Sequence, residues 1–449
     1  MTSASLKQRV LRAGGWSLAG FGLSQIIRFG SNLLMTRLLV PEMFGVMAMV
    51  QVVLYGLALF SDVGLRQNIV QSKRGHEPIY LNTAWVIQIL RGFLIWFIAL
   101  VLALLALLAN HIGLAPENSV FADTRLPHVI AVTAFSAIIA GFDSTKMFEA
   151  YRTLTFRRIT QIELVSQVAG LACMLVWVVF DRSIWALVIG GIAAALTRTL
   201  LSHAMLEGTA NRLQWEPQAF SEIIHFGKWI FASSILGFLA RSGDRLLLGG
   251  MLSTAELGVY AIAFLIVTSV ETVLAKIIGD VSYPALSEII RERPAELKKN
   301  YYRFHVVVAA FAYGCTGLLM TSGQSLMALL YDQRYADAGW MLEILAALLL
   351  TVPFRVAMQC FMAMGMPRLF SHIIAIQSCS IFVFMPVGFH YFGAQGALWG
   401  IVLSYFSSLP VIIFYKIKYG LFNAGKELLL LTAVPAGIMA GKALNLALG

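Results

Sequence analysis

Four arginines lie near the middle of long apolar segments, and they are the residues most able to do chemistry. They are Arg28, Arg91, Arg241 and Arg355. A charged side chain at the centre of a bilayer costs about 3 kcal/mol, so such residues usually serve a function. Guanidinium groups bind phosphate oxygens in a bidentate geometry. Glu271 is the one carboxylate near the middle of a segment, so the central arginines outnumber the central acids. This excess of positive charge favours an anionic substrate.

Polar residues around Arg28 form a stripe on the first apolar segment. They recur at spacings of three, four and seven, which places them on one face of a helix. The stripe consists of Ser17, Ser24, Gln25, Arg28, Ser31 and Asn32. We interpret this face as the wall of a hydrated cavity, with Gln25 and Asn32 beside the fixed charge of Arg28. The alternative is packing between helices through small polar residues, which explains the serines but not the arginine.

A second stripe surrounds Arg241. It consists of Ser234, Gly237, Arg241, Asp244 and Arg245. Asp244 is three residues from Arg241 and adjacent to Arg245, so part of this cluster should be a local ion pair. Two arginines outnumber one acid, and we therefore take both Arg241 and Arg245 as candidate cavity residues.

The remaining candidates lie on other segments. Arg91 shares a helix face with Gln88, and Arg355 follows Pro353, which should kink its helix. Glu271 is either a proton-coupling group or the partner of an arginine, and the sequence leaves both roles open.

These residues must be positioned by membrane-spanning helices. Of the 449 residues, 59% are hydrophobic and 12% are charged, and the mean hydropathy is +0.78. Apolar runs of about 20 residues, the length that crosses a bilayer, recur throughout. The expected spans are 14–39, 43–65, 79–108, 126–149, 160–181, 184–206, 222–249, 257–282, 302–323, 338–362, 368–391 and 396–417. We predict an all-α polytopic membrane protein.

The twelve spans divide into six and six. We expect an N-terminal lobe at 1–206, a linker at 207–221 and a C-terminal lobe at 222–426. A further apolar run at 427–446, weakened by Pro435 and Lys442, favours a thirteenth helix within 427–449.

An internal repeat supports this division. A shift of 213 residues places Gly14–Ala48 on Gly227–Ala261 without a gap, and 12 of 35 positions are identical. Arg28 and Arg241 are one of the identical pairs. A repeat in the same direction predicts two similar lobes, each beginning with the same helix–turn–helix.

Lysine and arginine residues predict the orientation. With the N-terminus in the cytoplasm, the inner segments carry 20 of these residues and the outer segments 3. Cytoplasmic loops are enriched in basic residues, so the N-terminus should be cytoplasmic. This bias also explains most of the net charge of +10 without nucleic acid as a partner. The longest inner connection, 284–303, should be an amphipathic helix at the membrane surface.

Enzyme signatures are missing from the sequence. There is no phosphate-binding P-loop, no H-E-x-x-H and no G-x-S-x-G. The four cysteines fall within apolar segments without the spacing of metal ligands. We therefore expect no catalytic residues, no cofactor and no metal.

Four motifs resemble those of a known family. They are R-L-L-V-P-E-M-F-G-V from Arg37, S-D-V-G-L-R-Q-N-I-V-Q from Ser61, G-D-R-L-L-L-G-G-M-L-S-T-A-E-L-G-V-Y from Gly243 and Y-P-A-L-S from Tyr283. They are similar to motifs of the polysaccharide-transporter (Wzx-type flippase) family in the multidrug/oligosaccharidyl-lipid/polysaccharide (MOP) exporter superfamily. The resemblance covers about 420 residues, and a full final helix pair of the fourteen-helix members is missing.

The resemblance implies two six-helix lobes that form a V around a central cavity. It implies transfer of an undecaprenyl-diphosphate-linked oligosaccharide across the bacterial inner membrane by alternating access, driven by an ion gradient. The product would be O-antigen, capsule or exopolysaccharide, and polysaccharide polymerase and chain-length proteins would be partners. Arginines on the first helix of a lobe contact the diphosphate in related flippases, a role that falls here on Arg28 and Arg241.

Of three other functions, two remain as alternatives, a multidrug exporter and a scaffold. A cation-coupled multidrug exporter of the same superfamily would favour central carboxylates over arginines. A membrane-embedded glycosyltransferase would need catalytic acids and large outer loops, and the sequence has neither. A scaffold that organises a polysaccharide assembly complex without transport is compatible with the sequence.

Overall fold

A computed structural model describes the backbone of residues 6–153 and 155–448, with side chains except at 6–14, 17, 226, 228–233, 235 and 236. Helices and the turns between them account for the described chain, and it contains no strand. The predicted all-α class is confirmed. Contacts divide the chain into two compact units, Met1–Phe238 (unit 1) and Leu239–Gly449 (unit 2).

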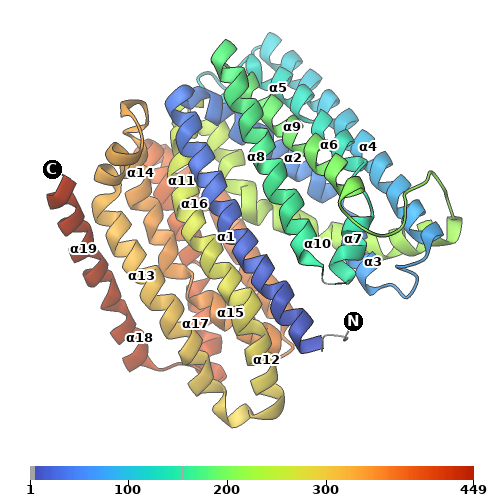
Figure 1. Cartoon of the computed structure of the whole chain (residues 1–449). Helices are drawn as coiled ribbons and strands as arrows, with labels where there is room; N and C mark the ends of the chain where they lie inside the picture. Colours follow the sequence, from blue (N-terminus) through green and yellow to red (C-terminus); the bar gives the residue numbers. More distant parts are fainter. Residues whose placement is uncertain (1–5, 154, 449) are drawn as a thin grey trace. The chain divides into compact units, whose positions relative to one another are not determined.

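Unit 1 contains nine complete helices and the first part of a tenth (Figure 1). They are α1 (Leu6–Leu38), α2 (Pro41–Phe60), α3 (Leu65–Gln71), α4 (Pro78–His111), α5 (Arg125–Thr133), α6 (Phe135–Gly141), α7 (Lys146–Arg152), α8 (Phe156–Phe180), α9 (Trp185–Ala204) and α10 (Pro217–Met251). A short 3₁₀ turn, η1 (Val120–Ala122), precedes α5.

Unit 2 begins within α10 and continues to the end of the described chain. Its α-helices are α11 (Thr254–Ile277), α12 (Tyr283–Glu292), α13 (Leu297–Leu330), α14 (Ala338–Leu345), α15 (Phe354–Ala363), α16 (Pro367–Phe406), α17 (Leu409–Lys418), α18 (Ala424–Leu431) and α19 (Ala433–Leu448). A π-helical turn, η2 (Ile278–Ser282), joins α11 to α12, and the 3₁₀ segments are η3 (Pro294–Glu296), η4 (Gln333–Tyr335) and η5 (Ala346–Thr351).

Local sequence signals explain several helix ends. Pro41 and Pro78 occupy the first turns of α2 and α4, where a missing backbone N–H costs nothing. The Ser253 side chain accepts from the Glu256 N–H, and the Glu256 carboxylate accepts from the Ser253 N–H, which makes a capping box for α11. Gly393 has φ 60° and reverses the chain within α16, at the predicted turn between two spans.

The predicted spans all fall on helices. Nine helical segments within the described residues are long and apolar enough to cross a membrane, or ten if the bent segment 125–152 counts as one span. One of the nine, Pro367–Lys418, contains two predicted spans, and another, Ala424–Leu448, contains the predicted thirteenth helix. The break at η5, just before Pro353, confirms the predicted kink.

The repeat extends to the helix boundaries. Helix α1 ends at Leu38 and α10 at Met251, while α2 begins at Pro41 and α11 at Thr254, so both boundaries differ by the predicted 213 residues. The same shift relates the starts of two broken helices, α5 at 125 and α14 at 338. Each unit therefore reuses one helix pair and one broken helix at equivalent chain positions.

The predicted linker at 207–221 is not a free connection. The Asn211 carboxamide accepts from the Ser144 hydroxyl at 2.7 Å and donates to Thr145 Oγ1 at 2.6 Å. Gln214 accepts from the Asn82 amide at 2.7 Å. We call residues 207–216 the strap, because these bonds hold it against α4 and the residues just before α7. The grouping of contacts places the division between the units further along, at Phe238 and Leu239 within α10.

Arg74 fastens the end of the strap and the start of α10. Its guanidinium pairs with Glu77 at 2.8 Å, Glu216 at 2.7 Å and Glu222 at 3.3 Å. Hydrogen bonds with Glu216 and then Glu77 raise the pKa of Arg74 above its usual range. Beneath this cluster, Ala219 and Ile223 of α10 pack in an apolar core with residues of α3 and α4.

One predicted element differs. Residues 284–303 do not form one separate helix, since the amphipathic helix α12 covers only their first part and ends at Glu292. Helix α12 instead continues from α11 through the π-helical turn, and α13 starts at Leu297, only five residues after α12 ends. The prediction of a short amphipathic helix is therefore confirmed for Tyr283–Glu292 only, because the charges of 291–299 mark the turn between α12 and α13, and its location at the membrane surface stays a prediction.

The C-terminal helix packs along α13 in unit 2 (Figure 1). Glycines allow the two backbones to approach closely: a Cβ added at Gly437 would lie 2.1 Å from the Gly314 carbonyl oxygen, and one at Gly317 2.2 Å from that of Val434. Small residues of this kind are typical of close helix packing in membranes. The apolar run at 427–446 is therefore divided between α18 and α19, and α19 packs closely on α13 within unit 2.

Candidate functional site

Arg28 and Arg241 occupy equivalent positions on α1 and α10. Both side chains are exposed, and neither has a hydrogen bond, an ion pair or a ring contact among the described residues. Exposed guanidinium groups on apolar helices keep all five N–H donors available for an anion. Each unit thus presents one uncompensated cation at the same place in its first repeated helix.

The stripe around Arg28 has mixed surroundings. Gln167 of α8 donates to Ser24 at 2.7 Å, and Gly20 of α1 approaches Thr160 closely, so part of the stripe serves helix packing, as the alternative interpretation proposed. The Gln25 amide nitrogen is buried without a hydrogen-bond partner in the described chain. Asn32 is half-buried on the same helix. Ser17 lies outside the described side chains.

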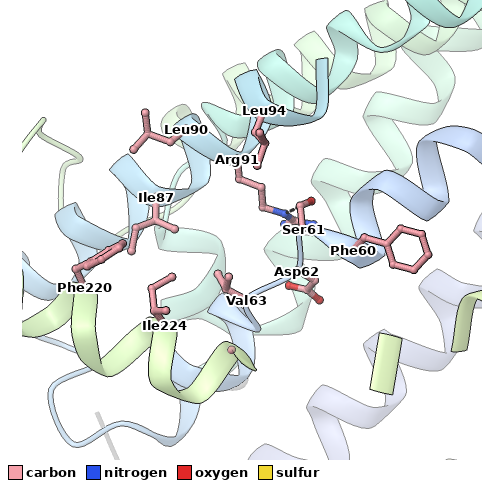
Figure 2. A pocket seen from close by; sticks show the side chains of 11 residues that line it. Phe60, Ser61, Asp62, Val63, Ile87, Leu90, Arg91, Leu94, Phe220 and Ile224 are labelled. Carbon is pink, nitrogen blue, oxygen red and sulfur yellow. Dashed lines mark hydrogen bonds between the residues drawn. The ribbon is translucent and has the colours of Figure 1, made fainter. Parts of the chain in front are cut away.

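Arg91 of α4 is fixed by neutral groups. Its Nε donates to Ser61 Oγ at 3.0 Å and its Nη2 to the Ala58 carbonyl oxygen at 2.6 Å, both at the end of α2 (Figure 2). Asp62 follows Ser61 and lies within electrostatic range, although the two make no direct ion pair in the described structure. Gln88, predicted on the same face, donates instead to the carbonyl oxygens of residues 140, 141 and 143.

Arg355 and Glu271 form an ion pair in unit 2. Arg355 Nη2 lies 2.5 Å from Glu271 Oε1, and this contact joins α15 to α11. The residues are 84 positions apart, so the sequence could not distinguish a paired carboxylate from a lone one. The structure therefore provides the arginine partner that was one of two roles open for Glu271.

Arg245 is also partly neutralised. Its Nε lies 3.9 Å from Asp244 Oδ2, and its guanidinium lies 5.0 Å from the centre of the Phe264 ring. The Tyr260 hydroxyl donates to Asp244 Oδ2 at 2.6 Å. This cluster confirms a local ion pair in the second stripe, formed with Arg245 rather than Arg241.

Tyr405 of α16 lies within electrostatic range of both ion pairs of unit 2. The pairs and Tyr405 thus form one polar cluster that connects α10, α11, α15 and α16. Sequence reasoning missed Tyr260 and Tyr405, because a tyrosine in an apolar helix looks like ordinary core composition. It also missed Asp62, which lies in one of the recognised motifs but between helices.

The arrangement separates two kinds of cation. Arg355 and Arg245 are held by acids within unit 2, whereas Arg28, Arg91 and Arg241 have no direct acidic partner in the described chain. An arginine that is paired with an acid can change partner when that acid is protonated. An arginine without an acidic partner can bind an anion without breaking an existing ion pair.

Comparison with known proteins gives a consistent result. The family model described as "Polysaccharide biosynthesis protein" matches residues 34–339, more than half of the chain. The lipopolysaccharide biosynthesis protein WzxC of Escherichia coli K12 is 22% identical over 354 residues, which cover 76% of this chain and 67% of WzxC. Across the curated relatives, the aligned region spans between 46% and 67% of their own lengths.

Two solved structures share the fold. The lipid II flippase MurJ in an inward closed conformation superposes with a TM-score of 0.68 at 11% identity, covering 96% of this chain and 92% of MurJ. A multidrug resistance MATE family transporter of the MOP superfamily, in its inward-facing conformation, gives a TM-score of 0.63 at 14% identity, covering 96% and 95% of the two chains.

Proposed function

Because the chain belongs to the polysaccharide biosynthesis protein family, as the sequence resemblance to Wzx-type transporters predicted, we propose that it is a lipid-linked oligosaccharide flippase. Its substrate is an undecaprenyl-diphosphate-linked oligosaccharide, which it moves from the cytoplasmic to the outer leaflet of the bacterial inner membrane. The observation that carries this proposal is the repeated, uncompensated arginine at positions 28 and 241.

The physical problem in this transfer is the headgroup. A diphosphate and many sugar hydroxyls would lose their hydration in hydrocarbon, at a cost of several kcal/mol for each unsatisfied polar group. Guanidinium groups and polar side chains such as Gln25 replace that hydration along the path. Alternating access then changes the side from which the path is open, while the prenyl chain stays in the lipid.

The Glu271–Arg355 pair is the proposed coupling element. When a proton neutralises Glu271, Arg355 loses its acidic partner and its guanidinium becomes available to another anion. A proton gradient can thereby bias which arrangement of unit 2 is favoured. The N-terminus is cytoplasmic in this proposal, and polymerase and chain-length proteins receive the product.

The drug-exporter alternative fits the charges less well. A cationic drug needs an available carboxylate, yet Glu271 and Asp244 are both engaged by arginines within unit 2. The scaffold alternative requires no arginine at all, and it is the one that an experiment must separate from the flippase.

The test is complementation of a flippase-deleted strain with Arg28→Ala, Arg28→Lys and Arg241→Ala. We expect surface polysaccharide to fall at least about tenfold in the alanine variants, because each loses a charged hydrogen bond to phosphate. The lipid-linked intermediate should accumulate on the inner leaflet, and Arg28→Lys should retain partial export.

Arg334→Ala is the matched control, since Arg334 pairs with Asp332 in a short connection of unit 2. Membrane abundance is measured for every variant. Full export by all arginine variants at normal abundance would reject the flippase mechanism and favour the scaffold.

A further inference from the structure

Two cavities in unit 1 share Arg91 and Asp62. One cavity, of about 510 Å³, lies between α2, α4 and the first part of α10 (Figure 2). The other, of about 370 Å³, lies between the ends of α2 and α3 and helices α4, α6 and α7. Arg91 and Asp62 thus lie where the two cavities meet. The linings of the two cavities differ in polarity.

The first cavity is apolar apart from Ser61, Asp62 and Arg91. Its walls are formed by Phe60, Val63, Ile87, Leu90, Leu94, Phe220 and Ile224. Leu90 and Leu94 are 57% and 50% exposed, and they belong to a stripe of exposed apolar residues along one face of α4. A face of this kind on a membrane-spanning helix contacts lipid, so the cavity opens toward hydrocarbon.

The second cavity is more polar than the first and has an excess of positive charge. Its charged lining residues are Arg66, Arg91, Arg198, Asp62 and Asp143. Arg198 and Asp143 pair with each other, with 3.4 Å between Nε and Oδ2. Arg66 lies over the Tyr151 ring and has no acidic partner in the described structure. One positive charge is therefore left over in this cavity.

Arg91 has donors left for a ligand. Nε and Nη2 are engaged by Ser61 and Ala58, while Nη1 has no partner among the described residues. One Asp62 oxygen accepts the Gly64 N–H at 2.9 Å, which fixes the carboxylate at the turn. The cation at the junction is thus rigidly placed and only partly satisfied.

We propose that these cavities bind a membrane phospholipid whose headgroup carries one net negative charge. An acyl chain occupies the apolar cavity, the phosphate lies at Arg91, and the rest of the headgroup occupies the polar cavity near Arg66. The single excess cation matches a single negative charge, whereas a diphosphate would bring a larger negative charge toward Asp62. The proposal does not depend on the proposed function, which rests on Arg28 and Arg241.

The test is native mass spectrometry of the full-length protein titrated with dioleoyl phosphatidylglycerol, phosphatidylethanolamine or phosphatidylcholine. The unaltered protein should bind phosphatidylglycerol about tenfold more tightly than phosphatidylcholine. Arg91→Gln and Arg66→Gln should each remove most of this preference. Asp62→Asn should increase it, because the amide still accepts the Gly64 N–H while the excess charge rises.

Ile224→Trp tests the apolar arm, since it fills the cavity and should weaken all three lipids without changing their ranking. Arg334→Gln in unit 2 is the control for loss of one arginine and should leave binding unchanged. Equal binding of the three lipids to the unaltered protein would overturn the proposal, as would normal preference in both Arg91→Gln and Arg66→Gln.

A polyprenyl diphosphate added as competitor separates this proposal from the substrate path. If it binds in place of phosphatidylglycerol with higher affinity, and loses that affinity in Arg91→Gln, the cavities belong to the substrate and the phospholipid proposal is rejected. If Arg28→Ala exports normally while Arg91-dependent phospholipid binding persists, only the flippase mechanism fails.

Discussion

Unit 1 begins with one copy of the repeated helix pair and unit 2 begins within the other copy, yet the two units neutralise their interior arginines in different ways. Arg91 of unit 1 donates hydrogen bonds to a serine hydroxyl and a backbone carbonyl, whereas Arg355 of unit 2 pairs with a carboxylate. A neutral partner leaves the charge available to a ligand, and an acidic partner turns the charge into a contact between helices. The repeat therefore conserves the scaffold and changes what the arginines do.

Unit 2 carries a further charged cluster that unit 1 does not match among the described residues. Lys416 is 0% exposed and pairs with Glu427 at 2.6 Å, and His305, also 0% exposed, lies 3.2 Å from the other Glu427 oxygen. Tyr302 donates to Glu427 at 2.7 Å. These contacts join α13, α17 and α18, so the C-terminal helices are tied into unit 2 by charge as well as by glycine packing.

The largest expected effect comes from breaking this cluster. Glu427→Gln leaves the fully buried Lys416 ammonium without a counter-charge, and we expect unit 2 to lose about 3 kcal/mol of stability. Thermal unfolding of the purified protein measures the loss. The double variant Glu427→Gln with Lys416→Met removes both charges and should recover most of it. An unchanged melting temperature in the single variant would show that the cluster is not structural.

A smaller loss is expected at the Glu271–Arg355 pair, because both side chains are partly accessible. Glu271→Gln should cost about 2 kcal/mol, after allowance for solvent screening. If the pair also couples transport to protons, the variant should lose the dependence of export on the proton gradient. A variant that is destabilised but still responds to the gradient would leave the pair with a structural role only.

The corresponding change in unit 1 should cost less. Arg91→Gln loses two hydrogen bonds to neutral groups, and the glutamine can replace one of them, so we expect about 1 kcal/mol. The loss of stability in Arg91→Gln, divided by the loss in Glu271→Gln, tests whether the two units hold their arginines differently. Equal costs in the same unfolding assay would mean that Arg91 is as structural as Arg355.

The smallest effect concerns the strap. Arg74→Gln removes ion pairs with three partly exposed carboxylates, and the other strap bonds through Asn211 and Gln214 remain. Global stability should hardly change, while limited proteolysis within 207–216 should become a few-fold faster, because local opening is easier. Asn211→Ala should increase the rate further. Protection equal to that of the unaltered protein would show that Arg74 does not hold the strap.

The sequence by itself determined the architecture of this protein. Apolar length identified the helices, because an unbroken backbone ladder is required to cross hydrocarbon. The 213-residue repeat predicted that each half begins with the same helix–turn–helix, and the helix ends at Leu38 and Met251 differ by that shift. The four motifs identified the family, since short loops between helices carry specific turn residues.

Only the tertiary structure decided which charged residues pair with each other. Glu271 and Arg355 are 84 residues apart and His305 and Glu427 are 122 apart, so no local pattern relates them. The strap looked like a linker because its residues are polar, and only their hydrogen bonds to α4 and the residues just before α7 show that it is held. Helix periodicity tells which face a charge occupies, whereas the charge opposite it depends on which helices pack together.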